Sequence, residues 1–309
     1  MMRNIVLTAC LAWFGLEGSQ AQASRESMTV ERFNAYAHEM ETGKIGSGTI
    51  LFANRIGTAY EALLESEVER TRTLADETED DLRSFFRASS VAVFYTGNPA
   101  YLDLMERSLA EIERRNIMST GLQTQMYEAY VRTRRLDAAS DLAARGGLQD
   151  VRSIPSITYA PKLEMEKPAW FRLEGNSDSL LLENPALDPQ LQVIVTTGAF
   201  CNPSHRALRE IHQDKALAGL LARHALWVMP ADAAIHSAVL KQLTTDYPEF
   251  RFGIAYGKRN WPMVDNWATP VFHVFKDGRL VDQVVGWPEG GRAEALRKAL
   301  SRAGAVSDL

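Results

Sequence analysis

The fold is decided by residues 191–204, which read LQVIVTTGAFCNPS. The first five are an apolar run typical of a buried strand, and residues 205 to about 222 have the apolar spacing of a helix. Cys201 is therefore expected where a strand leads into a helix. The first amides of a helix lack intrahelical partners, and with the helix dipole they favour an anion such as a thiolate. A thiolate is the form of cysteine that attacks disulfides, peroxides and metals.

The first residues resemble a secretory leader at 1–23. Arg3 supplies the positive start, residues 5–16 form a short apolar segment, and Ala21-Gln22-Ala23 is a small-x-small cleavage sequence. We expect the mature chain to begin at Ser24 and to be exported, most simply to a bacterial periplasm. A lipoprotein signal ending at Cys10 is a competing interpretation.

The composition restricts the function classes. The chain has two cysteines, Cys10 and Cys201, so removal of the leader leaves one, and no intramolecular disulfide can form in the oxidising compartment that the leader predicts. A formal net charge of -5 without a basic stripe argues against a nucleic-acid partner. No segment after the leader is long and apolar enough for a membrane span. The oligomeric state stays open.

A length of 309 residues favours two domains. Residues 24–150 have helical spacing throughout and predict an all-α domain, in which Asn98-Pro99 is a helix start. Residues 151–167 carry prolines and lose that spacing, which predicts a linker. Residues 168–309 predict the second domain.

Strands and helices alternate in the second domain. We expect strands at 169–173, 180–182, 191–195, 225–229, 250–256, 271–275 and 280–285, and helices at 205–222, 231–243 and 293–303. Lys276-Asp277-Gly278 is a hairpin turn. This order predicts a mixed sheet covered by helices on both faces.

Three features in this order resemble the thioredoxin-fold superfamily. Cys201-Asn202-Pro203-Ser204 matches the Cys-x-Pro-Cys box of that family, with Ser204 in place of the second cysteine. Thr269-Pro270 matches its Thr–cis-Pro step. Residues 271–286 match its final hairpin. The resemblance covers about residues 168–303 and implies an α/β thioredoxin-like fold after the helical domain.

Two departures from the family limit what the resemblance implies. The interval from Cys201 to Pro270 is longer than in minimal thioredoxins, which suggests an insertion. The resolving cysteine is missing, and a lone thiol cannot close onto itself to release a substrate. The resemblance therefore implies a monothiol variant, acting in thiol–disulfide exchange or in holding a client.

The resemblance also assigns roles around the cysteine. Cys201 is the expected nucleophile, and Ser204 and His205 are expected to modulate it, Ser204 as a hydrogen-bond donor and His205 as a cation. Pro203, Thr269 and Pro270 are the expected substrate-binding edge. The expected partner is a protein client or a small thiol resembling glutathione, and no cofactor or bound metal is expected.

Two alternatives remain open. In the first, Cys201 is an inert relic and the chain is a non-catalytic binding or scaffold protein, because folds outlast functions. In the second, Cys201 and His205 hold copper with a further ligand from His212 or His273.

Overall fold

The computed structural model describes residues 27–42, 49–146, 148, 151–175, 178–232 and 234–305. The leader predicted at 1–23 lies outside these residues. Within them the chain is a mixed α/β protein with eleven α-helices and one eight-stranded mixed sheet. The described part contains no helix whose length and apolar character would let it cross a membrane.

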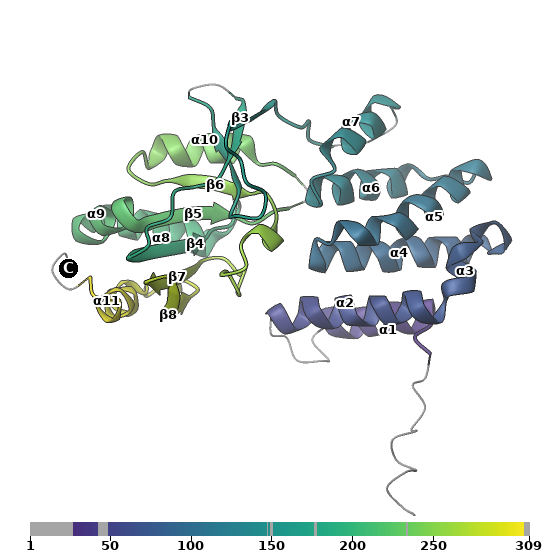
Figure 1. Ribbon diagram of the computed structural model, residues 1–309, viewed down its shortest axis with the longest axis horizontal. Coiled ribbons are helices and arrows are strands. Elements are labelled where there is room, and N and C mark those ends of the chain that lie inside the picture. Colours follow the sequence, from purple (N-terminus) through teal and green to yellow (C-terminus); the bar gives the residue numbers. More distant parts are fainter. Residues whose placement is uncertain are drawn as a thin grey trace, which may run out of the picture.

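Helices are the only regular elements of the described chain before residue 157 (Figure 1). In order these are α1 (Val30–Glu41), α2 (Thr49–Ser66), α3 (Val68–Arg72), η1 (Leu74–Asp76), α4 (Glu79–Thr96), η2 (Pro99–Tyr101), α5 (Leu102–Arg114), α6 (Thr120–Arg132) and α7 (Leu136–Ala144). We call them the helical half. The helix start predicted at Asn98-Pro99 is present as η2, where the Asn98 side chain accepts a hydrogen bond from the Ala100 amide at 3.2 Å.

The eight strands form one continuous sheet in the order β1-β3-β2-β6-β5-β4-β7-β8. Their bounds are β1 (Ile157–Tyr159), β2 (Trp170–Leu173), β3 (Leu180–Glu183), β4 (Leu191–Thr196), β5 (Ala225–Met229), β6 (Phe252–Ala255), β7 (Val271–Lys276) and β8 (Arg279–Val285). Strands β4, β5 and β6 are mutually parallel, and β7 runs antiparallel to β4 and β8. The carboxyl ends of three central strands therefore meet at one edge, which we call the carboxyl edge.

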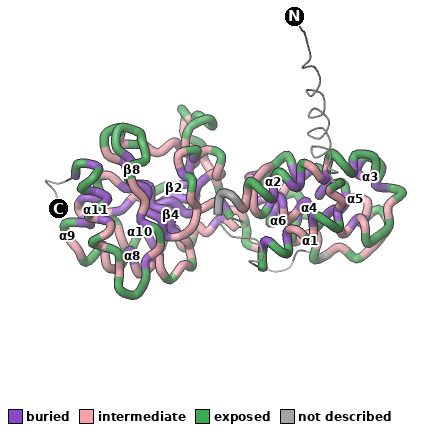
Figure 2. Tube along the Cα trace, turned by 90° about the horizontal axis from the view of Figure 1, so that it is seen from below, coloured by how far each residue is buried: buried purple, intermediate pink, exposed green. Residues whose placement is uncertain are grey.

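Four helices cover one face of the sheet. They are α8 (Asn202–Gln213), α9 (Lys215–His224), α10 (Ser237–Asp246) and α11 (Ala293–Arg302). Their buried residues share one core with Val193, Val195 and Trp227. Buried residues run through the centre of both the sheet and the helical half in Figure 2.

The other face of the sheet differs from the expectation that helices would cover it. Ile194, Leu226 and Val228 cluster there with Trp261 and Val264. Trp261 is fully buried and belongs to the connection between β6 and β7, whose one regular element is η3 (Lys258–Asn260). The connection between β6 and β7 covers this face, because the large Trp261 side chain fills the space over the aliphatic side chains of the central strands.

Three further predictions needed adjustment. The helix expected at 205–222 is two helices, because Asp214 leaves the helical conformation and its side chain caps α9 by accepting from the Leu217 amide at 3.2 Å. The helix expected at 231–243 begins at Ser237. The segment expected as a linker at 151–167 contributes β1, which pairs in parallel with β3.

Arg134 joins the helical half to the sheet. Its guanidinium donates to the carbonyl oxygens of Tyr256 at 2.6 Å and Ala255 at 2.8 Å, at the end of β6. Because β6 ends on the carboxyl edge, the helical half contacts that edge. Cys201 follows β4, the second strand along from β6, and so lies on the edge that the helices approach.

Candidate active site around Cys201

Cys201 precedes the first residue of α8 and is half-buried. Asn202 and Pro203 are the first two helical residues, where a proline costs no hydrogen bond because the first amides of a helix are unpaired in any case. The sulfur is thus held near the positive end of α8, as the sequence predicted.

The sulfur faces the segment that leads into β7. Its distance to the carbonyl oxygen of Thr269 is 3.2 Å. The Thr269–Pro270 peptide bond is cis, as expected from the resemblance. Residues 68 positions apart in the chain therefore meet at the thiol.

Thr196 fixes the distance between the two segments. It is the last residue of β4 and is fully buried. Its hydroxyl donates to the Ala268 carbonyl at 2.5 Å, and it accepts from the Val271 amide at 3.1 Å. These bonds hold the segment around Thr269 against β4, the strand that leads to Cys201. A threonine at a strand end carries no distinctive signal in the sequence, so Thr196 was not among the predicted site residues.

Gly198 allows the close approach of the two segments. A Cβ at this position would lie 2.7 Å from the Cβ of Cys201 and 2.9 Å from Oγ1 of Thr269. Both distances are under 3.0 Å, a separation that Cβ atoms in proteins essentially never show. Gly198 is required because there is no room for a side chain between the thiol and Thr269. Sequence analysis missed this requirement too.

Ser204 lies beneath the thiol and is fully buried. The Gly198 amide donates to its Oγ at 3.2 Å. Because the oxygen accepts this bond, its hydrogen remains available for the sulfur of Cys201. Ser204, which occupies the position of the second cysteine in the box that the sequence resembles, therefore contacts both the loop before the cysteine and the thiol itself.

Opposing influences set the acidity of Cys201. Burial raises the pKa of the Cys201 thiol, but hydrogen bonds from the Ser204 side chain, from Thr269 and from the Ser204 amide outweigh it, so the pKa lies below its ordinary value. The net direction favours the thiolate, the reactive form.

His205 has a different contact from the one expected. Its Nε2 lies 3.0 Å from the Ala199 carbonyl oxygen. A carbonyl only accepts, so Nε2 is the donor. The ring thus supports the loop before Cys201 through Ala199, whereas we expected it to place a positive charge beside the sulfur.

The further copper ligands considered from sequence are engaged elsewhere. His212 pairs with Glu249 at 2.5 Å. His273 is fully buried on β7 and bonds to the Ile194 carbonyl at 3.1 Å. Within the described ranges, no group of three or more histidine, cysteine or acidic side chains is arranged to hold a metal ion.

An aromatic and cationic group surrounds the residue that precedes Cys201. Phe200 directly precedes Cys201 and is 65% exposed. The guanidinium of Arg152 lies 5.7 Å from the centre of its ring, and the His236 ring meets it edge-on at 5.1 Å. Sequence analysis missed Phe200, although an aromatic residue directly before the cysteine was a visible signal.

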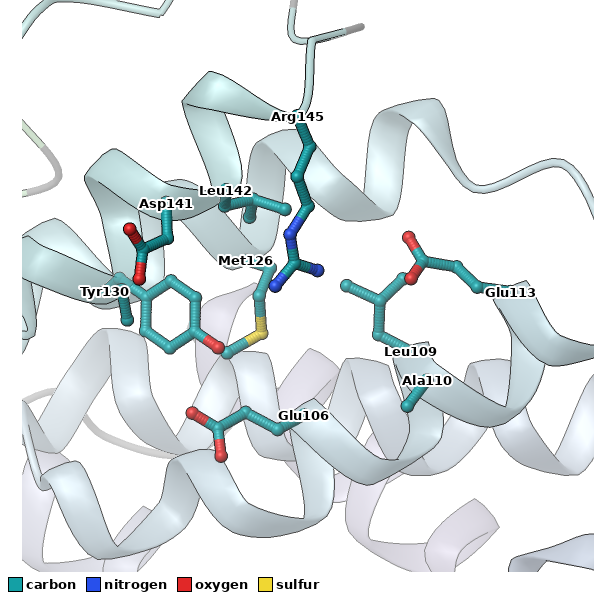
Figure 3. A pocket seen from close by; sticks show the side chains of 10 residues that line it. Glu106, Leu109, Ala110, Glu113, Met126, Tyr130, Asp141, Leu142 and Arg145 are labelled. Atoms are coloured by element: carbon teal, nitrogen blue, oxygen red, sulfur yellow. The ribbon is translucent and has the colours of Figure 1, made fainter.

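A pocket in the helical half is separate from this site. It lies among α5, α6 and α7, and Figure 3 shows the Arg145 guanidinium pointing into it between Glu106 and Glu113. Tyr130 lines it as well, and burial followed by the charge of Glu106 raises the pKa of Tyr130 to about 12. The pocket shares no side chain with the Cys201 site.

No family model matches the chain, and no curated protein matches it either.

Proposed function

We propose that the chain is an exported thioredoxin-like protein that acts in thiol–disulfide exchange through a single cysteine. The observation that carries the proposal is the setting of the Cys201 sulfur. It lies before the first turn of α8, its pKa is below the ordinary value, and it faces Thr269 and the cis bond to Pro270.

The order of elements supports the thioredoxin-like part of the proposal. A buried strand leads into Cys201 and α8, and the chain later returns through Thr269-Pro270 into the β7–β8 hairpin and α11. The interval between Cys201 and Pro270 holds two strands, β5 and β6, which accounts for its extra length. The leader predicted at 1–23 supports export to an oxidising compartment.

The chemistry follows from one thiolate. Sγ of Cys201 attacks one sulfur of a substrate disulfide, a new S–S bond forms, and the old bond breaks with its electron pair leaving on the second sulfur as a thiolate. The product is a mixed disulfide between Cys201 and the substrate. Since Ser204 cannot resolve it, release requires a thiol from a second molecule, and until then the client is held.

The proposed roles of the neighbours follow from their contacts. Ser204 donates to the thiolate and His205 holds the loop through Ala199. Thr269 and Pro203 are partly exposed and form the proposed surface that a client meets, and the buried Pro270 holds the Thr269 backbone beside the sulfur through the cis bond. A protein client or a small thiol fits this arrangement.

Alkylation of Cys201 tests the proposal. In a Cys10→Ser chain Cys201 is the only thiol, and its rate with iodoacetamide is measured across pH. We expect a midpoint below about 8.5, the ordinary thiol value. A midpoint at or above that value, or no alkylation before unfolding, overturns the proposal in favour of the scaffold alternative.

A second variant tests the missing resolving thiol. Ser204→Cys places a second sulfur where the family box has one. We expect the oxidised Cys10→Ser, Ser204→Cys chain to contain no free thiol and the reduced form to contain two, and we expect it to reduce a disulfide substrate catalytically. Two free thiols under oxidising conditions would contradict the proposed geometry.

A further inference from the structure

Positive charge gathers at the carboxyl edge beside Cys201. Three cationic side chains come from different segments: Arg132 at the end of α6, Arg152 before β1, and Lys258 at the start of η3. With Asp232, His236 and Phe200 they make up what we call the junction cluster. Its members lie between the helical half and the sheet.

Contacts link the cluster to the residue before the nucleophile. Arg152 covers Phe200 at 5.7 Å and lies 3.1 Å from Nδ1 of His236. A guanidinium only donates, so Nδ1 accepts and the ring hydrogen is on Nε2. That Nε2 lies 3.9 Å from Asp232, which pairs with Arg132 at 3.0 Å. One chain of contacts therefore runs from Phe200 to the helical half.

The positive charge of the cluster exceeds its negative charge. Burial lowers the pKa of Lys258, and Arg132 lowers it further, while Asp232 offsets part of this. Burial also lowers the pKa of Arg132, against the opposing charges of Asp232 and Glu128. The junction cluster thus holds three cationic side chains, Arg132, Arg152 and Lys258, and one carboxylate, Asp232, while Glu128 adds a second negative charge near Arg132. This local excess stands out on a chain with a formal net charge of -5.

Exposure shows which part of the cluster a substrate can meet. Arg152 is exposed and Phe200 is 65% exposed, whereas Arg132 and Lys258 lie deeper. The exposed aromatic ring directly before Cys201 in the chain thus carries a guanidinium over it, and the deeper cations lie further along the same set of contacts. An anionic group beside a substrate sulfur is attracted, and a cationic one is repelled.

We propose that the junction cluster selects disulfide substrates that carry a carboxylate close to the sulfur, with Arg152 as the specificity-determining contact. This inference rests on the proposed function of Cys201. The same charge favours the leaving thiolate of the exchange, since the displaced sulfur is itself an anion. The carboxylate belongs either to an acidic client segment or to a small acidic thiol.

Three small disulfides of different charge test the inference on the Cys10→Ser chain. These are 5,5′-dithiobis(2-nitrobenzoate), which carries two carboxylates, 4,4′-dithiodipyridine, which is neutral, and cystamine, which is cationic. The second-order rate constant of Cys201 is measured with each reagent at fixed pH. Because the reagents differ in intrinsic reactivity, the effect of a substitution on each rate is compared, instead of the rates themselves.

The test variant is Arg152→Gln, and the matched control is Arg292→Gln, an exposed arginine before α11 with the same change in charge. We expect Arg152→Gln to slow the anionic reagent about fivefold, to speed the cationic one, and to leave the neutral one within about twofold. Added salt should slow the anionic reagent in the parent chain and less so in Arg152→Gln. Arg292→Gln should change none of the rates by more than about twofold.

The outcomes separate the two proposals. Equal slowing of all three reagents by Arg152→Gln, or equal effects of both arginine variants, overturns the inference and leaves the reactive thiol standing. A parent chain that fails with the neutral reagent overturns the proposed function, and the inference with it. To distinguish a small acidic thiol from an acidic client, the effect of Arg152→Gln on the rate is compared for dithiodiglycolate and for a disulfide of the peptide Glu-Cys-Glu. A larger effect with dithiodiglycolate supports a small acidic thiol. A larger effect with the peptide disulfide supports an acidic client segment.

Discussion

The sulfur of Cys201 lies 3.2 Å from the carbonyl oxygen of Thr269. A carbonyl accepts only, so this contact suits the neutral thiol and not the thiolate. The donors that stabilise the anion are the side chain of Ser204, the side chain of Thr269 and the backbone amide of Ser204. The site thus gives each protonation state of the sulfur a partner, and Ser204 decides the balance.

Substitution of Ser204 should shift the equilibrium between the thiol and the thiolate of Cys201. We expect Ser204→Ala to raise the pKa of Cys201 by about one unit, because a hydrogen bond to a charged group is worth roughly 1.5–3 kcal/mol and one pKa unit corresponds to about 1.4 kcal/mol. The pH dependence of iodoacetamide alkylation measures it in the Cys10→Ser chain. Ser301→Ala, on the exposed side of α11, is the control. An unchanged midpoint would show that Ser204 does not donate to the sulfur.

The lowered pKa of Cys201 also predicts a pH-dependent stability. The folded state binds the proton less tightly than the unfolded chain, so the thiolate stabilises the fold above the unfolded pKa of about 8.5, and this contribution is lost as pH falls through the folded pKa. The free energy of unfolding in urea, taken as the parent minus Cys201→Ala, should therefore rise with pH up to about 9 and then level off. A difference that is flat over this range would contradict the lowered pKa.

Gly198 should tolerate no side chain. We expect Gly198→Ala to destabilise the fold by about 1–3 kcal/mol, the usual cost of forcing extra atoms into a packed region. The added Cβ would also push Cys201 away from Thr269 and Ser204, so the Cys201 pKa should move back toward its ordinary value. The control is Gly219→Ala in α9, where a Cβ meets nothing within 4 Å and the substitution should stabilise the helix by up to about 1 kcal/mol. Urea unfolding and alkylation measure both effects.

Arg134 should be essential where the two halves meet. We expect Arg134→Ala to cost about 2–4 kcal/mol, because the carbonyls of Ala255 and Tyr256 lose their buried donor. Arg135→Ala, the exposed neighbour, is the control and should change stability by less than about 0.5 kcal/mol. Urea unfolding gives the difference. If the two variants unfold alike, the contact of Arg134 with β6 contributes nothing to stability.

Sequence predicted the local features of the site better than its long-range ones. The turn at Asp277-Gly278 follows from residue types that accept positive φ, and its φ angles of 48° and 72° agree. The change from strand to helix at Cys201 likewise follows from residues close to it in the sequence. By contrast, the need for Gly198 arises from Thr269, far along the chain, and no pattern near residue 198 indicates it.

The junction between the halves illustrates the same limit. Arg134 reaches carbonyls more than 120 residues away, so its sequence neighbourhood shows only an ordinary polar helix end. Likewise, alternation of strands and helices does not state which face each helix covers. The expectation of helices on both faces failed because Trp261, in the connection after β6, occupies the second face.

His273 offers the last test, on acid stability. Burial lowers the pKa of His273, so the folded state keeps it neutral while the unfolded chain takes up a proton below about pH 6.5. Stability should therefore fall as pH drops below that value. Asp265, 3.6 Å from Nε2, opposes the shift and does not overcome burial.

We expect His273→Gln, which keeps an amide donor for Ile194 but does not titrate, to flatten the fall in the free energy of unfolding between pH 7.5 and pH 5.5. The surface variant His38→Gln should leave the slope unchanged. A parallel slope in parent and His273→Gln would show that acid acts elsewhere, and a steeper fall in His273→Gln would mean that Asp265 holds the protonated ring.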